Sequence, residues 1–441
     1  MMDTHAMAHD GLRTNRNFCM YFAARIVSQL GDQLYVFAIS WFVLDITKSS
    51  FHMAALLAVN SLAVMAVAPF GGLIADRVSR KWVMAGTDLI QGVVLLAIFL
   101  LQQGHFLSIG VLYAATALLG LCSAVFSPAA SAIVPGIVEG TRVPAAVAAG
   151  QAASNFCTIA GMVLGGALYR LIGISGILML NAVSNLAAAA MEARIRVAPV
   201  VSRTAGAGVR ASGELKRFVA DLKGGLRQMR LDRTVFFLLL VNTAFTLAVL
   251  PIAMVYMPYL FNVLLGASPL QAAVPQAATW AGIIAGSIVA ARLLHRRRPE
   301  ALIAAGLAAL AAHAILLVGL LGVSHLLGAA WMSAACTLGN AIAGAAGAFF
   351  VVPVYALFHA RSTDEFRGRF WGVESSLRTA AMCAGYFAAG ILAQRLPLGF
   401  VFAGTGVMLL FLFAGVVRLR PAPAPGGVRL VRSGRDPALR L

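Results

Sequence analysis

Long apolar runs separated by short polar connections dominate the chain. A run of about 20 mostly apolar residues is long enough to cross a bilayer as an α-helix, and the sequence contains twelve such runs. The first run is too long, and its flanks too polar, for a cleaved signal peptide, so we interpret it as a retained helix. The predicted spans are 18–45, 52–74, 82–102, 107–126, 143–171, 174–191, 234–263, 270–293, 301–323, 326–357, 370–393 and 397–417.

The composition also favours a polytopic helical membrane protein. Of the 441 residues, 60% are apolar and only 11% are charged, whereas a soluble globular chain carries about 25% charged residues. The five cysteines all lie in apolar runs without a C-x-x-C pair. That spacing indicates neither a zinc site nor a disulfide framework, and we interpret them as packing residues. The expected fold class is all-α and integral to the membrane.

The net charge of +18 raises the possibility of a nucleic-acid partner. The basic residues lie in short patches between the apolar runs, whereas a nucleic-acid binder gathers them on one folded face. With the N-terminus in the cytoplasm, the cytoplasmic connections and tails carry 29 Lys and Arg, and the opposite side carries only Lys48, Arg170 and Arg395. This distribution follows the positive-inside rule. It predicts a multi-pass protein of a bacterial inner membrane with both termini cytoplasmic.

One long polar connection, 192–233, divides the predicted spans into two sets of six. The resulting organisation is a tail (1–17), a six-helix half (18–191), the basic connection, a second six-helix half (234–417) and a basic tail (418–441). Transporters commonly have such paired halves, with the substrate site between them near the membrane midplane. Part of the connection, Glu214 to Arg230, has helical composition. We nevertheless interpret the whole connection as a flexible tether with an orienting charge cluster.

The connection between the second and third spans carries a motif. It reads Gly72-Leu-Ile-Ala-Asp76-Arg77-Val-Ser79-Arg80-Lys81 and resembles the G-x-x-x-D-R-x-G-R-R/K signature of the major facilitator superfamily, with Ser79 in place of the second glycine. The resemblance implies twelve helices in two pseudo-symmetric halves and a conformational switch at this loop. Gly72 would allow close helix approach, Asp76 would pair across the half interface, and Arg77, Arg80 and Lys81 would anchor the cytoplasmic side. Asp88, two turns into the third span, is expected to form a salt link to the loop arginines.

Further stretches resemble bacterial efflux members of this family, of the enterobactin-exporter-like and macrolide-efflux-like branch. They are Ser28-Gln-Leu-Gly-Asp32, Phe126-Ser-Pro128-Ala-Ala, Asn181, and Val352-Pro353 followed by Phe366-Arg367-Gly368-Arg369. The resemblance extends from residue 17 to residue 417. A lysophospholipid-transporter-like branch has similar Gly-Asp elements and a segment like Phe349 to Pro353. A siderophore, a macrolide-like drug and a lysolipid therefore all remain possible substrates.

Two departures from the family concern proton coupling. The motif of the fifth helix usually reads G-P-x-x-G-G, and here it is Gly161-Met162-Val-Leu-Gly165-Gly166. Without the proline, this helix lacks its usual kink-prone point. Thr116 stands where many drug/proton antiporters have an arginine in the fourth helix. Proton coupling must therefore use other groups.

The first span supplies the main candidates for coupling. Arg25, Gln29 and Asp32 lie on one helical face, and Asp32 is fourteen residues after Phe18, about 21 Å into the helix. An ionised carboxylate near mid-membrane is costly, so Asp32 is a candidate proton carrier. The alternative is a structural pair with Arg25, directly or through Gln29. Glu374 and Arg378, spaced i, i+4, form a second candidate pair, either for gating or for plain structure.

Uncharged polar residues in the spans are candidates to line a substrate cavity. The alternative role for each is interhelical hydrogen bonding, but as a set some are expected to face the cavity. These residues are Gln29, Gln151, Asn155, Asn242, Thr246, Gln276 and Asn340.

The sequence lacks the residue patterns of an enzyme. We find no catalytic triad, no zinc-ligand cluster and no G-K-[ST] phosphate loop, so we expect no catalytic residue, metal or cofactor. A membrane lipid-modifying enzyme, the alternative class, would need clustered His or Asp/Glu residues at one interface. The prediction is a monomeric secondary transporter that exports an amphiphilic small molecule, siderophore or drug-like, by alternating access against inward proton flow. A lipid transporter of the same fold is the alternative.

Overall fold

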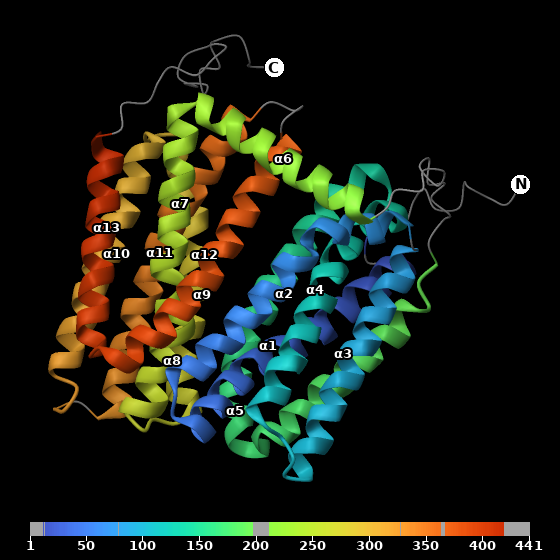
Figure 1. Cartoon of the computed structure of the whole chain (residues 1–441), viewed down its shortest axis with the longest axis horizontal. Coiled ribbons are helices and arrows are strands. Elements are labelled where there is room, and N and C mark those ends of the chain that lie inside the picture. The colour runs from blue at the N-terminus through green and yellow to red at the C-terminus, as the bar shows by residue number, and fades with distance from the viewer. Residues whose placement is uncertain are drawn as a thin grey trace, which may run out of the picture.

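The computed structural model describes residue 12 and residues 14–77, 79–196, 211–326, 328–362 and 367–418, without the side chains of 68–77, 211–217 and 367. Every regular element in this part of the chain is a helix (Figure 1). Most of the predicted tails and residues 197–210 of the predicted connection lie outside the described residues. The predicted all-α class is confirmed.

The amino-terminal half contains α1 (Arg16–Thr47), α2 (Ser50–Arg77), α3 (Arg80–Gln103), α4 (Ile109–Ile137), a 3₁₀ turn η1 (Gly140–Arg142) and α5 (Val143–Glu192). Polar side chains cap two of these helices, because the first backbone N–H groups of a helix lack partners within it. Asn15 accepts from the N–H of Phe18 at α1, and Ser108 accepts from Val111 at α4. The predicted end of the fourth span at residue 126 was too early. Membrane helices tolerate proline, and α4 continues past Pro128.

The element α5 contains two predicted spans. Its 50 residues would measure about 75 Å as one straight helix, more than twice the roughly 30 Å hydrocarbon core. Gly173 interrupts it with φ +63° and ψ −171°, a conformation that glycine adopts readily because it has no Cβ. The segments 143–172 and 174–192 are therefore separate spans, in agreement with the predicted 143–171 and 174–191.

The carboxy-terminal half follows an additional helix, α6 (Ala211–Leu231). It contains α7 (Arg233–Pro251), η2 (Ile252–Tyr256), α8 (Met257–Tyr259), η3 (Leu260–Leu264), α9 (Pro269–Leu294), α10 (Pro299–Gly322), α11 (Ala329–Arg361), α12 (Arg367–Arg395) and α13 (Leu398–Arg418). The elements from α7 to η3 form one continuous span with two π-helical stretches. Eleven described segments are long and apolar enough to cross a membrane, and the break at Gly173 brings the number to the predicted twelve.

The helix α6 corrects the interpretation of the whole connection as a tether. A Cβ at Gly225 would lie 2.9 Å from the carbonyl oxygen of Arg369, so the backbones of α6 and α12 are in close contact. Asp221 Oδ1 pairs with Arg369 Nε at 3.0 Å, and Met229 is buried in the core of the carboxy-terminal half. The apolar face of α6 therefore packs against that half.

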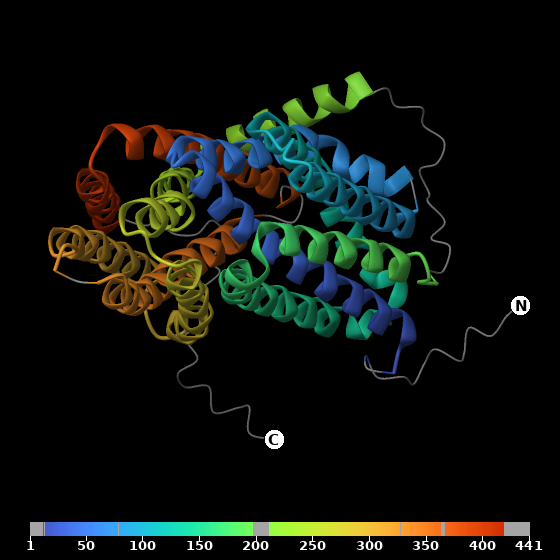
Figure 2. The ribbon, with the colours of Figure 1, turned by 90° about the horizontal axis from the view of Figure 1, so that it is seen from below.

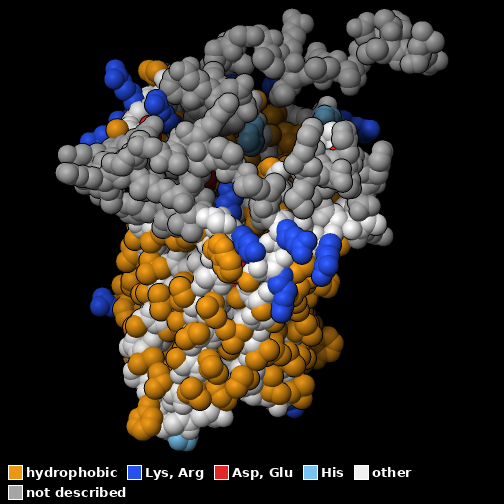
Figure 3. All heavy atoms as spheres, turned by 90° about the vertical axis from the view of Figure 1, so that its right-hand side faces the viewer, with side chains coloured by type: hydrophobic (Ala, Val, Ile, Leu, Met, Phe, Trp, Pro, Cys, Tyr) orange, Lys and Arg blue, Asp and Glu red, His pale blue; other side chains and the backbone are white. Residues whose placement is uncertain are grey.

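Basic side chains mark one end of the helical bundle. Figure 3 shows Lys and Arg gathered towards one end, above a band of hydrophobic side chains. The even number of spans brings the start of α1 and the end of α13 to this same end, the upper one in Figure 1, where α6 also lies. We call it the basic end and the opposite one the distal end.

The topology can be tested with reporter fusions. Fusions after residue 215 and in the carboxy-terminal tail should report a cytoplasmic location, whereas fusions near Lys48 and Arg395 should report an external one. The physical reason is the retention of basic segments on the cytoplasmic side. An external signal at residue 215 would contradict the division into two six-span halves.

Candidate functional site

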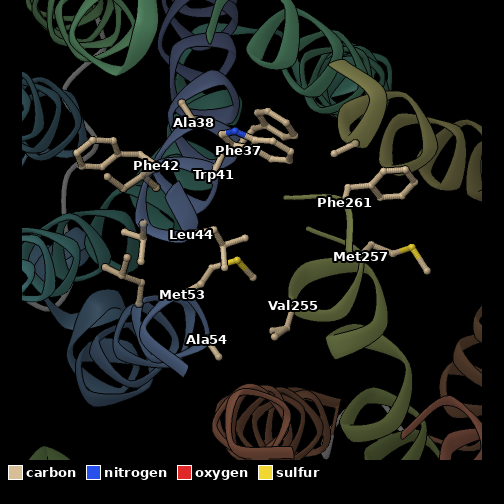
Figure 4. Packing of buried hydrophobic residues seen from close by; sticks show 14 of the residues in the cluster. Phe37, Ala38, Trp41, Phe42, Leu44, Met53, Ala54, Val255, Met257 and Phe261 are labelled. Atoms are coloured by element: carbon tan, nitrogen blue, oxygen red, sulfur yellow. The ribbon is translucent and has the colours of Figure 1, made fainter. Parts of the chain in front are cut away.

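The two halves share one apolar core at the distal end. A single buried cluster there contains Leu44 and Met53 from the amino-terminal half and Val255, Met257 and Phe261 from the other (Figure 4). At the basic end the buried clusters are separate. One includes Tyr21, Met84 and Ile133, and the other includes Leu238, Phe350 and Phe358. Apolar packing therefore closes the interface between the halves at the distal end.

Glycines bring helices of the two halves into close contact at this end. A Cβ at Gly166 of α5 would lie 2.6 Å from the Cβ of Ala273 on α9, and one at Gly390 of α12 would lie 2.8 Å from the Cβ of Ala54 on α2. Small residues permit such approach between membrane helices. The seam thus consists of the helix pairs α5–α9 and α2–α12, and Figure 2 shows the two halves side by side from below.

Polar contacts reinforce the closure. Asp45 of α1 accepts a hydrogen bond from Asn262 of η3 at 2.7 Å and another from the hydroxyl of Tyr169 on α5 at 3.0 Å. We call Asp45, Asn262 and Tyr169 the distal latch. Between α2 and α12, Ser50 donates to the carbonyl oxygen of Gly390 at 3.1 Å. The bonds of Asp45 to Asn262 and of Ser50 to Gly390 join the two halves and would have to break if the distal end opened.

A small cavity lies between the halves. Its volume is about 20 Å³, enough for roughly one water molecule. It is lined from the amino-terminal half by Phe37, Trp41 and Met162, and from the carboxy-terminal half by Met254, Pro258 and Gln276. This part of the interface is mostly apolar and too tightly closed to hold an organic molecule in this conformation.

Asp32 lies at the middle of α1, beside the second segment of α5. Its Oδ1 accepts hydrogen bonds from the side-chain amides of Asn181 at 3.3 Å and Asn185 at 3.2 Å. A Cβ at the neighbouring Gly31 would collide with the side chains of Asn181 and Ser184, so glycine is required for this approach. Two amides therefore hold one carboxylate deep in the amino-terminal half.

The two residues predicted to connect with Asp32 make other contacts. The guanidinium of Arg25 lies 5.3 Å from the ring centroid of Phe126 on α4, in range for a cation–π interaction. Gln29 donates to the hydroxyl of Ser154 on α5. Among the described residues, the hydrogen bonds to Asp32 come from Asn181 and Asn185 rather than from these two, while Arg25 stays close enough to attract its charge.

Two further acids are buried in the same half. Asp88 of α3 is 2% exposed, and Glu192, at the end of α5, is 0% exposed. Asp88 lies within range of charge interaction with Glu192, Asp32 and Arg25. Glu192 was expected at the start of the polar connection 192–233. In the structure it belongs to the core of the amino-terminal half.

The loop motif is described only in part. The side chains of Gly72, Asp76 and Arg77 lie outside the described residues. Arg80 donates from Nη1 to the carbonyl oxygen of Ala132 on α4 at 2.7 Å, and the Lys81 ammonium lies 5.0 Å from the Trp82 ring. The Arg80 contact fastens α3 to α4. The described charge neighbours of Asp88 are Glu192, Asp32 and Arg25, and the expected salt link to Arg77 falls on a side chain outside the described residues.

The carboxy-terminal half holds a buried acid with three partners on one carboxylate oxygen. Glu374 of α12 is 3% exposed, and its Oε1 lies 3.4 Å from Arg378 Nε, as the i, i+4 spacing predicted. The same oxygen accepts from the hydroxyl of Tyr355 at 2.8 Å and from Asn242 at 3.2 Å. An ionised carboxylate is thus well satisfied here, in contrast to Glu192.

Of the other cavity candidates, one lines the small cavity, one joins two helices, and the rest bond within their own helix. Gln276 lines the small cavity, and its side chain donates to Ala272 of its own helix. Asn340 donates to the carbonyl oxygen of Pro275, joining α11 to α9. The remaining contacts are within helices: Gln151 to Asn155 on α5, and Thr246 to the carbonyl oxygen of Asn242 on α7.

The glycines of the fifth-helix motif are packing positions. A Cβ at Gly161 would collide with the Cβ of Gln33, and one at Gly165 would lie 3.3 Å from the Cβ of Phe37. Both contacts are with α1, whereas Gly166 contacts α9. The motif therefore sets the distances of α5 from a neighbour in its own half and from one in the other half.

Sequence reasoning missed the residues whose partners are far away in the chain. Asp45 stood at the predicted end of a span and was treated as a boundary. Asn185, Tyr355, Tyr169 and Asn262 are single polar residues in apolar runs, without spacing to distinguish them. The structure identifies them through their contacts. Within the described part of the chain, no three His, Cys, Asp or Glu side chains are grouped so as to hold a metal ion.

Comparison with known proteins gives the family. The model of the Major Facilitator Superfamily matches residues 21–343. Macrolide efflux protein A of Streptococcus pyogenes is 22% identical over 399 residues, covering 89% of this chain and 93% of that protein. The uncharacterized MFS-type transporter YvqJ of Bacillus subtilis is 24% identical over 402 residues, covering 91% of this chain and 92% of that protein.

Solved structures share the fold. A point mutant of the nucleoside transporter NupG superposes with a TM-score of 0.70 at 13% identity, covering 90% of this chain and 99% of that one. A bacterial homologue of the iron transporter ferroportin, in an inward-facing state, superposes with a TM-score of 0.70 at 15% identity. The match covers 93% of this chain and 100% of that one. With the family match over most of the chain and the two-half helical fold, the chain belongs to the Major Facilitator Superfamily of membrane transport proteins.

Proposed function

We propose that the chain is a secondary active exporter, which moves an amphiphilic small molecule out of the cytoplasm in exchange for protons. The basic end then faces the cytoplasm of a bacterial cell. The similarity to macrolide efflux protein A supports export. The mostly apolar lining of the interface, with two methionines and Trp41, suits a molecule with a large apolar surface, because methionine adapts to varied shapes.

The surroundings of Asp32 carry the proposal of proton coupling. Asp32 is sixteen residues after the start of α1 at Arg16, about 24 Å along the helix. That position is half-way along the 32-residue α1, where an ionised carboxylate is costly. The amides of Asn181 and Asn185 donate to the ionised form. A change in the protonation of Asp32 therefore changes the charge at the centre of the amino-terminal half.

The protonated form also has a partner within reach. The amide oxygen of Asn185 is buried and has no hydrogen-bond donor among the described residues. Rotation of this amide would present the oxygen to a protonated Asp32, which can donate one hydrogen bond. Both protonation states can thus be accommodated without leaving the carboxyl group unpaired, as a proton carrier requires.

In an alternating-access cycle, the distal seam would be the gate that is closed in one conformation and open in the other. In the described conformation the distal end is closed by the shared apolar core and by the distal latch. Export requires a second conformation in which this end opens and the separate cores at the basic end come together. Protonation of Asp32 from the outside, followed by release to the cytoplasm, would drive the cycle in the export direction.

Replacement of Asp32 by Asn tests the coupling. Asp32→Asn fixes a neutral side chain of the same shape, so substrate should still exchange down its gradient while export against a gradient is lost. The assay is substrate movement in proteoliposomes with an imposed pH gradient. Glu300→Gln, at the basic end of α10, is the matched control and should behave as the native protein. Uphill export by Asp32→Asn at the native rate would contradict the proposal.

Replacement of Arg25 by Ala tests the charge that acts on Asp32. The guanidinium favours the ionised carboxylate, so its removal favours the protonated form. The pH at which uphill export is half-maximal should rise by about one unit, a tenfold change in proton concentration. Arg170→Ala, at the exposed distal end, should leave the pH profile in place. An unshifted profile for Arg25→Ala would show that this charge does not act on the proton carrier.

A further inference from the structure

Asp88 and Glu192 are acids that the proposed export cycle does not use. Both Oε atoms of Glu192 and the Oδ2 of Asp88 are buried, and none of the three has a hydrogen-bond partner among the described residues. A buried carboxylate is normally ionised only when it is paired and hydrogen-bonded, because its desolvation costs several kcal/mol. Binding a proton removes this cost. Two unpartnered buried acids are therefore places where protons are held.

The charges around these acids do not balance. Tyr21, Arg25 and Asp32 face the group from α1, and Cys122 faces it from α4. Among the described residues, Arg25 is the one cation that acts on each of the three acids. One guanidinium can neutralise one carboxylate, so complete ionisation would leave two negative charges in the interior.

We propose that Asp88 and Glu192 form a second proton-binding site inside the amino-terminal half, which competes with Asp32 for the charge of Arg25. Its ligand is the proton. When Glu192 or Asp88 is ionised, Arg25 is attracted towards that acid and Asp32 binds its proton more firmly. When both are protonated, the charge of Arg25 stabilises ionised Asp32, which then releases its proton more easily. The presence of the site is independent of transport, and only its effect on export rests on the proposed function.

The proton site can be measured without transport. In infrared difference spectra a protonated carboxyl group absorbs apart from a carboxylate, so the purified full-length protein at neutral pH should show protonated-carboxyl absorption. Glu192→Gln and Asp88→Asn should each reduce it. Glu139→Gln, which changes an exposed acid at the basic end, is the matched control and should not. Unchanged protonated-carboxyl absorption in either buried variant would overturn the proposal.

The competition for Arg25 can be measured in proteoliposomes. Glu192→Gln removes a competing negative charge, so ionised Asp32 is favoured and the pH of half-maximal uphill export should fall by about one unit. Asp88→Asn should shift it in the same direction and is the second variant if Glu192→Gln does not fold. Glu139→Gln should keep the native profile. Profiles of both buried variants that superimpose on the native one would overturn the competition.

The two experiments separate this inference from the proposed function. If Asp32→Asn exports uphill normally while the infrared absorption is lost in Glu192→Gln and Asp88→Asn, the proton site stands and proton-coupled export fails. If Asp32→Asn abolishes uphill export while the infrared spectra and pH profiles of both buried variants stay native, export stands and the second site fails.

Discussion

The apolar seam at the distal end is the contact on which the rest of the structure depends. Membrane helices gain little from the hydrophobic effect against one another, and close packing of small residues is a main source of their association. Gly166 and Gly390 provide that closeness between the halves, and large side chains such as Phe261 fill the space around it. Because the basic end has two separate cores, the halves can move apart at this seam without breaking either of those cores.

The charges are distributed unequally between the halves. In the carboxy-terminal half, Glu374 has an ion pair and two hydrogen-bond donors, so its ionised form is satisfied where it stands. In the amino-terminal half, three acids depend on Arg25, and two of them lack hydrogen-bond partners for one or both oxygens. This asymmetry favours the amino-terminal half as the one that exchanges protons, with the other half acting mainly as its packing partner.

Sequence periodicity predicted the fold well because every span must be apolar over the thickness of the membrane. The break at Gly173 was also predicted, since the apolar stretch exceeded one membrane crossing. The sequence did not predict the roles of residues whose contacts lie far away in the chain. Glu192 was placed in the connection and Asp45 at a boundary, although one is a core residue and the other contacts both halves. The connection was interpreted as a flexible tether despite the helical composition of Glu214 to Arg230, so the packing of α6 on α12 was not expected.

Under the proposed alternating access, the distal seam must open in every export cycle. Gln394 of α12 donates to Ser49, beside the start of α2, in the closed seam, so cysteines at these two positions lie within reach of a short, reducible thiol cross-linker such as a bis-methanethiosulfonate. In the Ser49→Cys/Gln394→Cys protein, cross-linking should stop export in proteoliposomes, reduction should restore it, and the single-cysteine variants should be insensitive to the cross-linker. Export at the native rate by fully cross-linked protein would contradict the claim.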